Sequence, residues 1–215
     1  MLEREKIQLV EKWESEHVIA DRRVIGAFRK IRRELFVPLE YAGQAYIDEP
    51  LPIPAGQTIS QPTTVVLMLD ALEVMQGQKV LEIGTGSGYN AALLSVLVGE
   101  TGKVITTEIV PELVKFAKEN LQKAGIRNVL VVHSDGSRGY EKEAPYDRII
   151  CTAAAPRIPK VLEEQLKEGG ILLIPVGPIH AQKMIKARKT KGGLEIQELG
   201  DYVFVPLMGR YGIKE

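Results

Sequence analysis

The chain of 215 residues is 45% hydrophobic and 26% charged, which makes it long and apolar enough to bury a substantial core. Lys plus Arg and Asp plus Glu both number 28, so the sequence offers no global positive charge to concentrate nucleic-acid backbones around it. No stretch reaches the roughly 18 apolar residues of a membrane span, and the charged N-terminus lacks the apolar middle region of a signal peptide. The single cysteine, Cys151, allows no internal disulfide. Together these features predict a cytoplasmic protein.

Two amphipathic helices are predicted at the start of the chain. Apolar residues recur at helical spacing over residues 3–17, Ile7 among them, and again over residues 22–35. Asp21 is suited to cap the second helix and Pro38 to stop it. The second helix is locally basic, which favours a solvated face balanced by acids elsewhere over a binding site for RNA.

A long irregular segment follows. Residues 41–62 contain four prolines and two glycines and show no periodicity, which predicts a loop. Loops of this length are uncommon inside compact domains, and they carry function more often than other segments. Thr58 and Ser60 place two hydroxyls just before Pro62, so this part is either a substrate loop or a helix-capping turn.

Beyond residue 62 the chain alternates between helices and strands, and after residue 177 two strand-like runs surround a turn at residues 191–193. The predicted fold is α/β: a doubly wound, mostly parallel sheet with an antiparallel C-terminal hairpin and an N-terminal helical extension, in a single domain spanning residues 1–215. Its three parts are the N-terminal helices and loop (1–62), the α/β core (63–177) and the hairpin with the following segment (178–215). The predicted helices of the core are 63–75, 88–98, 111–125 and 159–170, and its strands are 78–84, 103–109, 129–134, 147–152 and 171–177.

The stretch VLEIGTGSGYN, residues 80–90, runs from a predicted strand through a glycine turn into a helix. Such a turn lets backbone N–H groups approach a ligand beyond the carboxyl end of the strand. Gly84, Gly86 and Gly88 form G-x-G-x-G, whereas dinucleotide enzymes use G-x-G-x-x-G, and Tyr89 stands where their third glycine belongs. Glu82 puts a carboxylate beside the turn, which suits a cationic amine better than a pyrophosphate.

Two further acids follow the next strands. Glu108 ends one strand at the separation from the glycines at which an acid accepts hydrogen bonds from ribose hydroxyls. Asp135 and Gly136 follow the third strand, where an acid can meet an adenine amino group. A ligand with an ammonium group, a ribose and an adenine is S-adenosylmethionine. The motif E-x-G-x-G-x-G with a distal acid resembles the first two motifs of class I methyltransferases.

Other chemistries find less support. The signature of methylation on base amino groups is missing, because residues 153–156 read Ala-Ala-Ala-Pro where Asn or Asp, Pro-Pro and an aromatic belong. His17, His133 and His180 are scattered and form no metal-ligand pair, so no metal is predicted. Cys151 lies in an apolar run and is interpreted as core filling rather than as a catalytic thiol.

The chain as a whole resembles the protein-L-isoaspartate O-methyltransferases. The resemblance implies a Rossmann-like methyltransferase sheet and transfer of a methyl group from S-adenosylmethionine to the free carboxylate of isoaspartyl residues in damaged proteins. The resulting ester collapses to a succinimide, which hydrolyses partly to normal aspartate. The stretches that carry the resemblance are 45–62, 80–94, 134–140, 145–156, 166–177 and 203–209.

The resemblance also implies roles for particular residues. Ser60 matches the family's catalytic serine. Ser134 and Val65 depart from the pattern, since many relatives have a glycine at the first position and some have a histidine at the second. The predicted substrate-binding residues are Ser60, Val205, Pro206 and Leu207. The predicted cofactor-binding residues, which include those of the glycine turn, are Gln57, Thr58, Ile59, Ser60, Glu82, Gly84, Gly86, Gly88, Glu108, Ile109, Asp135 and Gly136.

Three alternatives stay open at this stage. A nicotinamide-dependent dehydrogenase is disfavoured by Tyr89, and an RNA methyltransferase has only the basic residues 22–33 in its support. A protein that binds S-adenosylmethionine without turnover has the same cofactor motifs. The expected partners are isoaspartyl proteins and peptides, with no nucleic acid and no membrane, and the expected state is a monomer.

Overall fold

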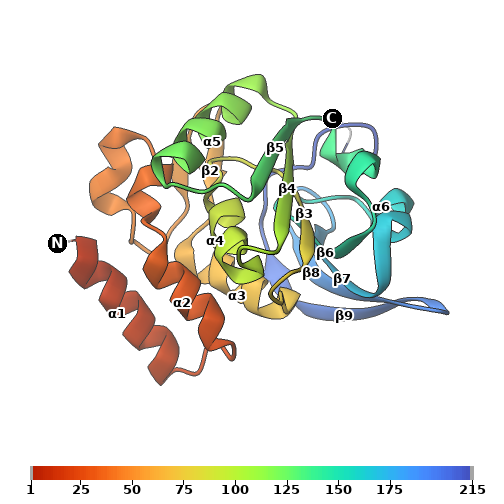
Figure 1. The fold of residues 1–215 in the computed structure, drawn as a ribbon, viewed down its shortest axis with the longest axis horizontal. Helices are drawn as coiled ribbons and strands as arrows, with labels where there is room; N and C mark the ends of the chain where they lie inside the picture. The colour runs from red at the N-terminus through yellow and green to blue at the C-terminus, as the bar shows by residue number, and fades with distance from the viewer. Residues whose placement is uncertain (1, 214–215) are drawn as a thin grey trace.

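A computed structural model describes residues 2–213 and is built around one seven-stranded sheet (Figure 1). The strand order is β5-β4-β3-β6-β7-β8-β9; the first five strands are parallel, and β8 and β9 pair antiparallel at one edge. The expected α/β fold with an antiparallel hairpin is confirmed. The strands are β3 (Lys79–Ile83), β4 (Lys103–Glu108), β5 (Val129–His133), β6 (Tyr146–Cys151), β7 (Leu166–Val176), β8 (Gln182–Thr190) and β9 (Gly193–Tyr202).

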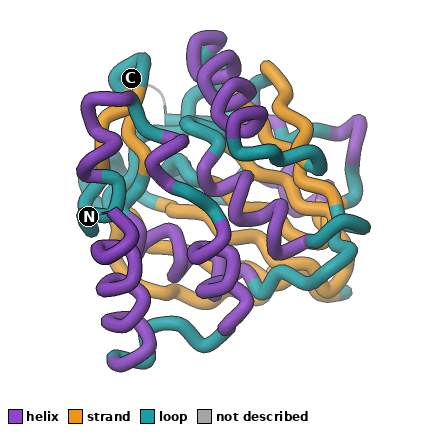
Figure 2. The backbone as a smooth tube through the Cα atoms, turned by 60° about the vertical axis from the view of Figure 1, so that its left-hand side comes forward, coloured by secondary structure: helices purple, strands orange, loops and turns teal. Residues whose placement is uncertain are grey.

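Helices cover both faces of the sheet unequally, and Figure 2 shows the helical layer in front of the strands. Helices α3, α4 and α5 pack on one face together with the N-terminal helices, and α6 packs on the other. The helices are α1 (Leu2–Ser15), α2 (Arg22–Lys30), α3 (Pro62–Leu72), α4 (Tyr89–Val98), α5 (Pro111–Lys123) and α6 (Lys160–Gln165), with 3-10 turns η1 (Arg33–Phe36), η2 (Leu39–Gln44), η3 (Gly136–Arg138) and η4 (Glu141–Glu143).

The central strands are apolar on both faces because both faces are covered. In β3, Val80 belongs to the core beneath α3, α4 and α5, whereas Leu81 and Ile83 belong to the core beneath α6. All three side chains are buried. The near-continuous apolar runs of the sequence are thus explained by strands that face two cores, and the glycine turn leaves the sheet from its middle.

The N-terminal extension is fastened to the core through Trp13. Its ring is fully buried, packs edge-on against Phe28 at 4.8 Å between centroids, and donates from Nε1 to Thr63 Oγ1 at 2.8 Å. The buried face of α1 also uses Leu9, whereas Ile7, which the spacing placed in the apolar stripe, is 49% exposed. Burying so large an aromatic group ties the extension to α3, which begins directly after the loop.

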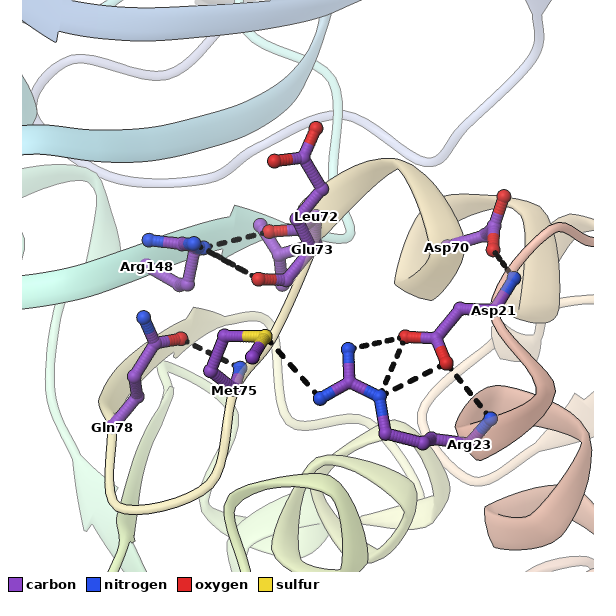
Figure 3. Close-up of polar contacts among 8 residues, drawn as sticks. All are labelled: Asp21, Arg23, Asp70, Leu72, Glu73, Met75, Gln78 and Arg148. Atoms are coloured by element: carbon purple, nitrogen blue, oxygen red, sulfur yellow. Dashed lines mark hydrogen bonds and ion pairs between the residues drawn. The ribbon is translucent and has the colours of Figure 1, made fainter.

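The C-terminal end of α3 is held from two sides (Figure 3). Arg148 of β6 donates from Nε to the carbonyl of Leu72 at 2.8 Å and from Nη2 to that of Glu73 at 2.9 Å. These are carbonyls that a helix end leaves without intrahelical partners. On the other side, the backbone N–H of Asp21 donates to Asp70 Oδ1 at 2.7 Å, which joins the start of α2 to α3.

Two predicted elements of the N-terminal part differ from the structure. The helix expected to reach residue 35 ends at Lys30, and a separate 3-10 turn follows. Within the segment 41–62, predicted as a loop, β1 (Leu51–Ile53) and β2 (Gln57–Ile59) form a short antiparallel pair. Backbone hydrogen bonds across a tight turn hold the pair. Strands of three residues are too short to show an alternating side-chain pattern in the sequence.

Two predicted elements of the C-terminal part differ as well. The helix expected over residues 159–170 ends at Gln165, and β7 begins at Leu166, which pairs with Tyr146. The C-cap of the helix, Leu166, is already extended, with a φ of −86° and a ψ of 137°. Sheet pairing overrides the local helical pattern at this position. The second strand-like run of the hairpin extends to Leu207 in the sequence, but β9 ends at Tyr202 and the chain then turns back across the ends of the parallel strands.

Candidate active site

A crevice lies beyond the carboxyl ends of β3, β4 and β6. From β3 the chain leads to β4 on one side, and it later returns to β6 on the other, so this is the point where strand order reverses and α/β sheets bind ligands. The space measures about 950 Å³ out to its open mouth. The residues on its walls come from five segments: 57–60, 82–90, 107–113, 152–153 and 205–208, with Val65, Met68 and Gly136 in addition.

Two glycines of the turn, Gly84 and Gly88, have different functions. Gly84 has a φ of 93°, and a Cβ there would lie 2.5 Å from Thr152 Oγ1, which donates to the Gly84 carbonyl at 2.7 Å. Gly88, with a φ of 85°, is the N-cap of α4, and a Cβ there would press against Ala117 and Leu121 of α5 at 3.3 Å. Gly84 therefore keeps the turn close to β6, whereas Gly88 lets α5 pack against it. Both positions need a residue without a side chain.

Glu82 lies on the crevice wall and is fully buried. Its Oε1 accepts from Asn90 Nδ2 at 2.7 Å and its Oε2 from Thr106 Oγ1 at 2.6 Å. Burial raises the pKa of Glu82 to about 7, and the charge of Glu108 adds to the rise, while the two hydrogen bonds oppose it. A cation entering the crevice would favour the ionised form, so Glu82 is suited to meet an ammonium group.

A second hydroxyl continues from Thr106 into the glycine turn. Thr85 Oγ1 lies 2.7 Å from Thr106 Oγ1, and either atom can donate. With Glu82 ionised, Thr106 donates to the carboxylate and accepts from Thr85. With Glu82 protonated, the Glu82 proton can be donated to Thr106 and the chain can reverse. The charge of Glu82 is thereby coupled to the hydrogen bonding of the turn.

Glu108 ends β4 and faces the turn from the opposite side. Its Oε2 accepts from the Gly86 N–H at 3.0 Å, and its Oε1 accepts from the N–H groups of Ile109 and Val110 at 2.9 and 3.0 Å. Three backbone donors therefore fix a carboxylate that is itself almost fully buried. A lone pair remains on Oε2, and Glu108 and Ile109 both line the crevice. Hydroxyl groups of a ribose are suitable donors to such a fixed acceptor.

Asp135 is placed differently from its neighbour Gly136. Gly136 lines the crevice, where a Cβ would lie 2.5 Å from Thr107 Oγ1, whereas the Asp135 carboxylate is engaged next to it. Its Oδ1 accepts from the N–H and hydroxyl of Ser137 at 3.0 and 2.6 Å, and its Oδ2 accepts from the Arg210 N–H at 2.9 Å. The adenine contact predicted for Asp135 therefore has to share this carboxylate with the C-terminal segment.

Two chain segments, residues 57–60 and residues 205–208, line the crevice in addition to the strand ends. Ser60 lines it, with its carbonyl accepting from Arg33 Nη2 at 2.8 Å; its hydroxyl makes no hydrogen bond to any other residue of the described chain. Val205 and Leu207 lie along Ala154: the Ala154 N–H donates to the Val205 carbonyl, and the Leu207 N–H to the Ala154 carbonyl, both at 2.8 Å. The predicted catalytic and substrate-binding residues thus border the same opening, together with Pro206, Gln57, Thr58 and Ile59.

Several residues of the site were not found from the sequence. Asn90 and Thr106 hold Glu82, and their polar side chains in otherwise apolar stretches were the available signal. Arg33 was counted with a solvated basic face, but its side chain is fully buried. Cys151 is buried as expected, and burial raises its pKa to about 12. Within residues 2–213, no three His, Cys, Asp or Glu side chains gather as metal ligands do, and no helix is long and apolar enough to span a membrane.

The arrangement fits a nucleoside that carries a positive charge. Two buried carboxylates, Glu82 and Glu108, flank the glycine turn, and the remaining wall is largely apolar. A pyrophosphate would meet both negative charges at this place, which disfavours a dinucleotide. Ser60, whose hydroxyl has no hydrogen-bond partner within residues 2–213, lines the same space.

The chain is similar to known proteins over nearly its whole length. The sequence model of the family described as protein-L-isoaspartate(D-aspartate) O-methyltransferase matches residues 4–212. A protein-L-isoaspartate O-methyltransferase from Pyrococcus abyssi is 50% identical over 208 residues, covering 96% of this chain and 95% of the relative. One from Methanococcoides burtonii is 48% identical over 192 residues, covering 89% and 95%.

Solved structures agree with the sequence relatives. One described as a protein-L-isoaspartate O-methyltransferase has a TM-score of 0.85 at 31% identity and covers 98% of this chain and 67% of that chain. Another, from Plasmodium falciparum and described as a protein-L-isoaspartate O-methyltransferase in complex with S-adenosyl-L-homocysteine, has a TM-score of 0.81 at 28% identity, with coverages of 94% and 97%.

Proposed function

The chain belongs to the protein-L-isoaspartate(D-aspartate) O-methyltransferase family, and we propose that the crevice beyond β3, β4 and β6 is where its reaction takes place. The enzyme transfers a methyl group from S-adenosylmethionine to the free carboxylate of L-isoaspartyl residues in damaged proteins. The methyl ester collapses to a succinimide. The observation that carries the assignment of the site is that Glu82, Glu108 and the free hydroxyl of Ser60 border one opening.

The cofactor side of the crevice is assigned to the glycine turn and its acids. S-adenosylmethionine, when bound, supplies an electrophilic methyl group on a sulfonium. In the proposal Glu82 holds the ammonium end and Glu108 accepts from the ribose hydroxyls. Burial of both carboxylates supports these roles, since an attraction between charges is stronger away from water. Asp135 and Gly136 are assigned to the adenine, and residues 57–60 to the methionine part.

Alignment is the main task of the substrate side. A carboxylate with an ordinary pKa near 4 is already ionised at pH 7, so the reaction needs no general base. Ser60 donates from its hydroxyl to one oxygen of the isoaspartyl carboxylate and turns the other oxygen toward the methyl group. Fixing two reactants in line can contribute about 7 to 11 kcal/mol through effective molarity. The absence of a competing partner for the Ser60 hydroxyl within residues 2–213 supports this role.

The backbone of the substrate is assigned to Val205, Pro206 and Leu207. These residues border the opening beside Ser60 and are held by two hydrogen bonds to Ala154, which supports a fixed, extended edge. An isoaspartyl residue carries its chain through the side-chain carbon and leaves its α-carboxylate free. A backbone clamp at one side of Ser60 would therefore direct this free carboxylate toward the crevice.

We further propose that the protein acts as a cytoplasmic monomer without nucleic acid. Three of the six basic residues over 22–33 pair with acids: Arg23 with Asp21 at 2.5 Å, Arg29 with Glu14 at 3.3 Å and Arg32 with Glu34 at 2.9 Å. Sedimentation at assay concentration and salt-dependent binding to RNA test the two parts of this proposal separately.

The test is transfer of labelled methyl from S-adenosylmethionine to an isoaspartyl peptide, beside the same peptide with aspartate. Label on the isoaspartyl peptide alone is expected. A hydrogen bond to a charged group contributes about 1.5 to 3 kcal/mol, so Ser60→Ala should lower kcat by about 10- to 100-fold. Ser15→Ala, an exposed serine at the end of α1, is the matched control and should leave kcat unchanged. Equal labelling of both peptides would refute the substrate assignment, and unchanged kcat in Ser60→Ala would refute the role of Ser60.

A further inference from the structure

Arg33 is a fully buried cation behind the wall of the crevice. It begins η1, after the end of α2, and its side chain turns inward beneath residues 45–60. Its Nε donates to the Ala45 carbonyl at 2.7 Å and its Nη2 to the Ser60 carbonyl at 2.8 Å. One guanidinium therefore holds Ala45 and Ser60, which lie on either side of the β1–β2 pair in the sequence.

The guanidinium also contacts the cofactor side of the site. It lies over the ring of Tyr89 at 4.9 Å from the centroid, and Tyr89 is the first residue of α4, next to Gly88 of the glycine turn. Tyr89 is fully buried and lines the crevice. Arg33 thus connects the segment carrying Ser60 with the turn that faces the cofactor, through contacts that all lie inside the protein.

This arrangement is costly if its only purpose is to stabilise the fold. No carboxylate of residues 2–213 lies within ion-pair distance of Arg33, and its Nη1 has no hydrogen-bond partner among them. Burial lowers the pKa of Arg33, which expresses the penalty for a charge away from water. A buried charge costs several kcal/mol, and an apolar side chain of similar volume often stabilises a protein at least as well.

The geometry of Ser60 offers a reason for the cation. The carbonyl held by Arg33 belongs to Ser60, which lines the crevice and whose hydroxyl is proposed to bind the substrate carboxylate. Fixing that carbonyl restricts the rotation of the backbone from which the Ser60 side chain projects. A planar fork with donors on two nitrogens can hold Ala45 and Ser60 at once while it stacks on a ring, and a lysine ammonium cannot.

We propose that Arg33 is a positioning residue for methyl transfer, which sets the direction of the Ser60 hydroxyl from behind. The inference rests on the role proposed for Ser60. It predicts that Arg33 affects the reaction through Ser60 and has little effect of its own once that hydroxyl is gone.

The test is a double-mutant cycle with Arg33→Lys and Ser60→Ala. Arg33→Lys should lower kcat at least about 10-fold, while the affinity for S-adenosylhomocysteine changes less than about 3-fold. In the Ser60→Ala background, the same substitution should change kcat less than about 2-fold. Arg32→Lys is the matched control, because Arg32 is exposed and pairs only with Glu34, and it should leave kcat unchanged.

Each outcome bears on one part of the argument. If Arg33→Lys lowers kcat equally in both backgrounds, or only in proportion to the unfolded fraction seen by circular dichroism, the positioning role is refuted while the proposed function stands. If Ser60→Ala leaves kcat unchanged, the role of Ser60 fails and the inference with it. Should Arg33→Lys not fold, Tyr89→Leu, which removes the ring beneath the guanidinium, replaces it in the same cycle, and an additive effect there overturns the inference.

Discussion

Binding of S-adenosylhomocysteine should depend on pH through Glu82. The carboxylate is fully buried, and burial raises its pKa to about 7, above an ordinary value of 4.5. The folded protein therefore binds this proton more tightly than the unfolded chain does. The contribution of Glu82 to stability is full below pH 4.5 and is lost as pH rises through about 7. A ligand with an ammonium group reverses the preference, because it favours the ionised carboxylate.

The size of the effect follows from the ionised fraction. With a pKa of about 7, Glu82 is about one tenth ionised at pH 6 and about nine tenths ionised at pH 8. If the ligand binds the ionised form, its affinity should fall about 10-fold from pH 8 to pH 6, and at pH 7 its binding should release about half a proton. The Thr106 and Thr85 hydroxyls allow this change without loss of a hydrogen bond, since their donors can reverse.

Isothermal titration calorimetry measures both quantities, with pairs of buffers of different ionisation enthalpy giving the proton count. Glu82→Gln should bind S-adenosylhomocysteine with the same affinity at pH 6 and pH 8, because it removes the carboxylate whose pKa burial raises to about 7. Adenosine, which lacks the ammonium, should bind the wild-type protein without this dependence. A 10-fold pH effect that persists in Glu82→Gln would refute the reasoning.

Three further predictions concern the surroundings of the site. Gly209 has a φ of 109° and no room for a Cβ beside Asp135. Gly209→Ala should therefore strain the C-terminal segment by about 1 to 3 kcal/mol and raise KM for the isoaspartyl peptide at least about 5-fold. Gly192→Ala in the exposed hairpin turn is the control, and equal KM values for the two variants would contradict the prediction. Arg148→Met should lower the free energy of unfolding by about 2 to 4 kcal/mol in urea, because the last carbonyls of α3 lose their donor, and an unchanged midpoint would count against it. Because burial raises the pKa of Cys151 to about 12, the native protein should resist thiol reagents at pH 8 that modify the unfolded chain, and rapid labelling of the native protein would be the opposite result.

The parts of the site that follow from local sequence could be predicted. Glu82 and Glu108 end neighbouring parallel strands, and carboxyl ends of parallel strands meet at one edge of the sheet. The glycines between strand and helix located the crevice for the same reason. The apolar runs of the strands and their alternation with helices were sufficient to predict the order of the core elements and the terminal hairpin.

The remaining features depend on contacts between distant parts of the chain. The Asp135 carboxylate is engaged by the backbone of Arg210, 75 residues later, and no local pattern indicates this. Arg33 lies in a run of basic residues whose other members are exposed, so the sequence alone could not distinguish its burial. The last part of the helix predicted over residues 159–170 belongs instead to β7, which begins at Leu166. The pairing partner of Leu166, Tyr146, is in another element, so no local pattern indicates this change.

A crystal structure with S-adenosylhomocysteine and an isoaspartyl peptide tests the central assignment most directly. We expect the Ser60 Oγ within about 2.5 to 3.0 Å of one oxygen of the free carboxylate, with the other oxygen facing the sulfur of the ligand. We also expect the ammonium of the ligand beside Glu82. A ligand sulfur outside this crevice, or a Ser60 hydroxyl directed away from the carboxylate, would contradict the account.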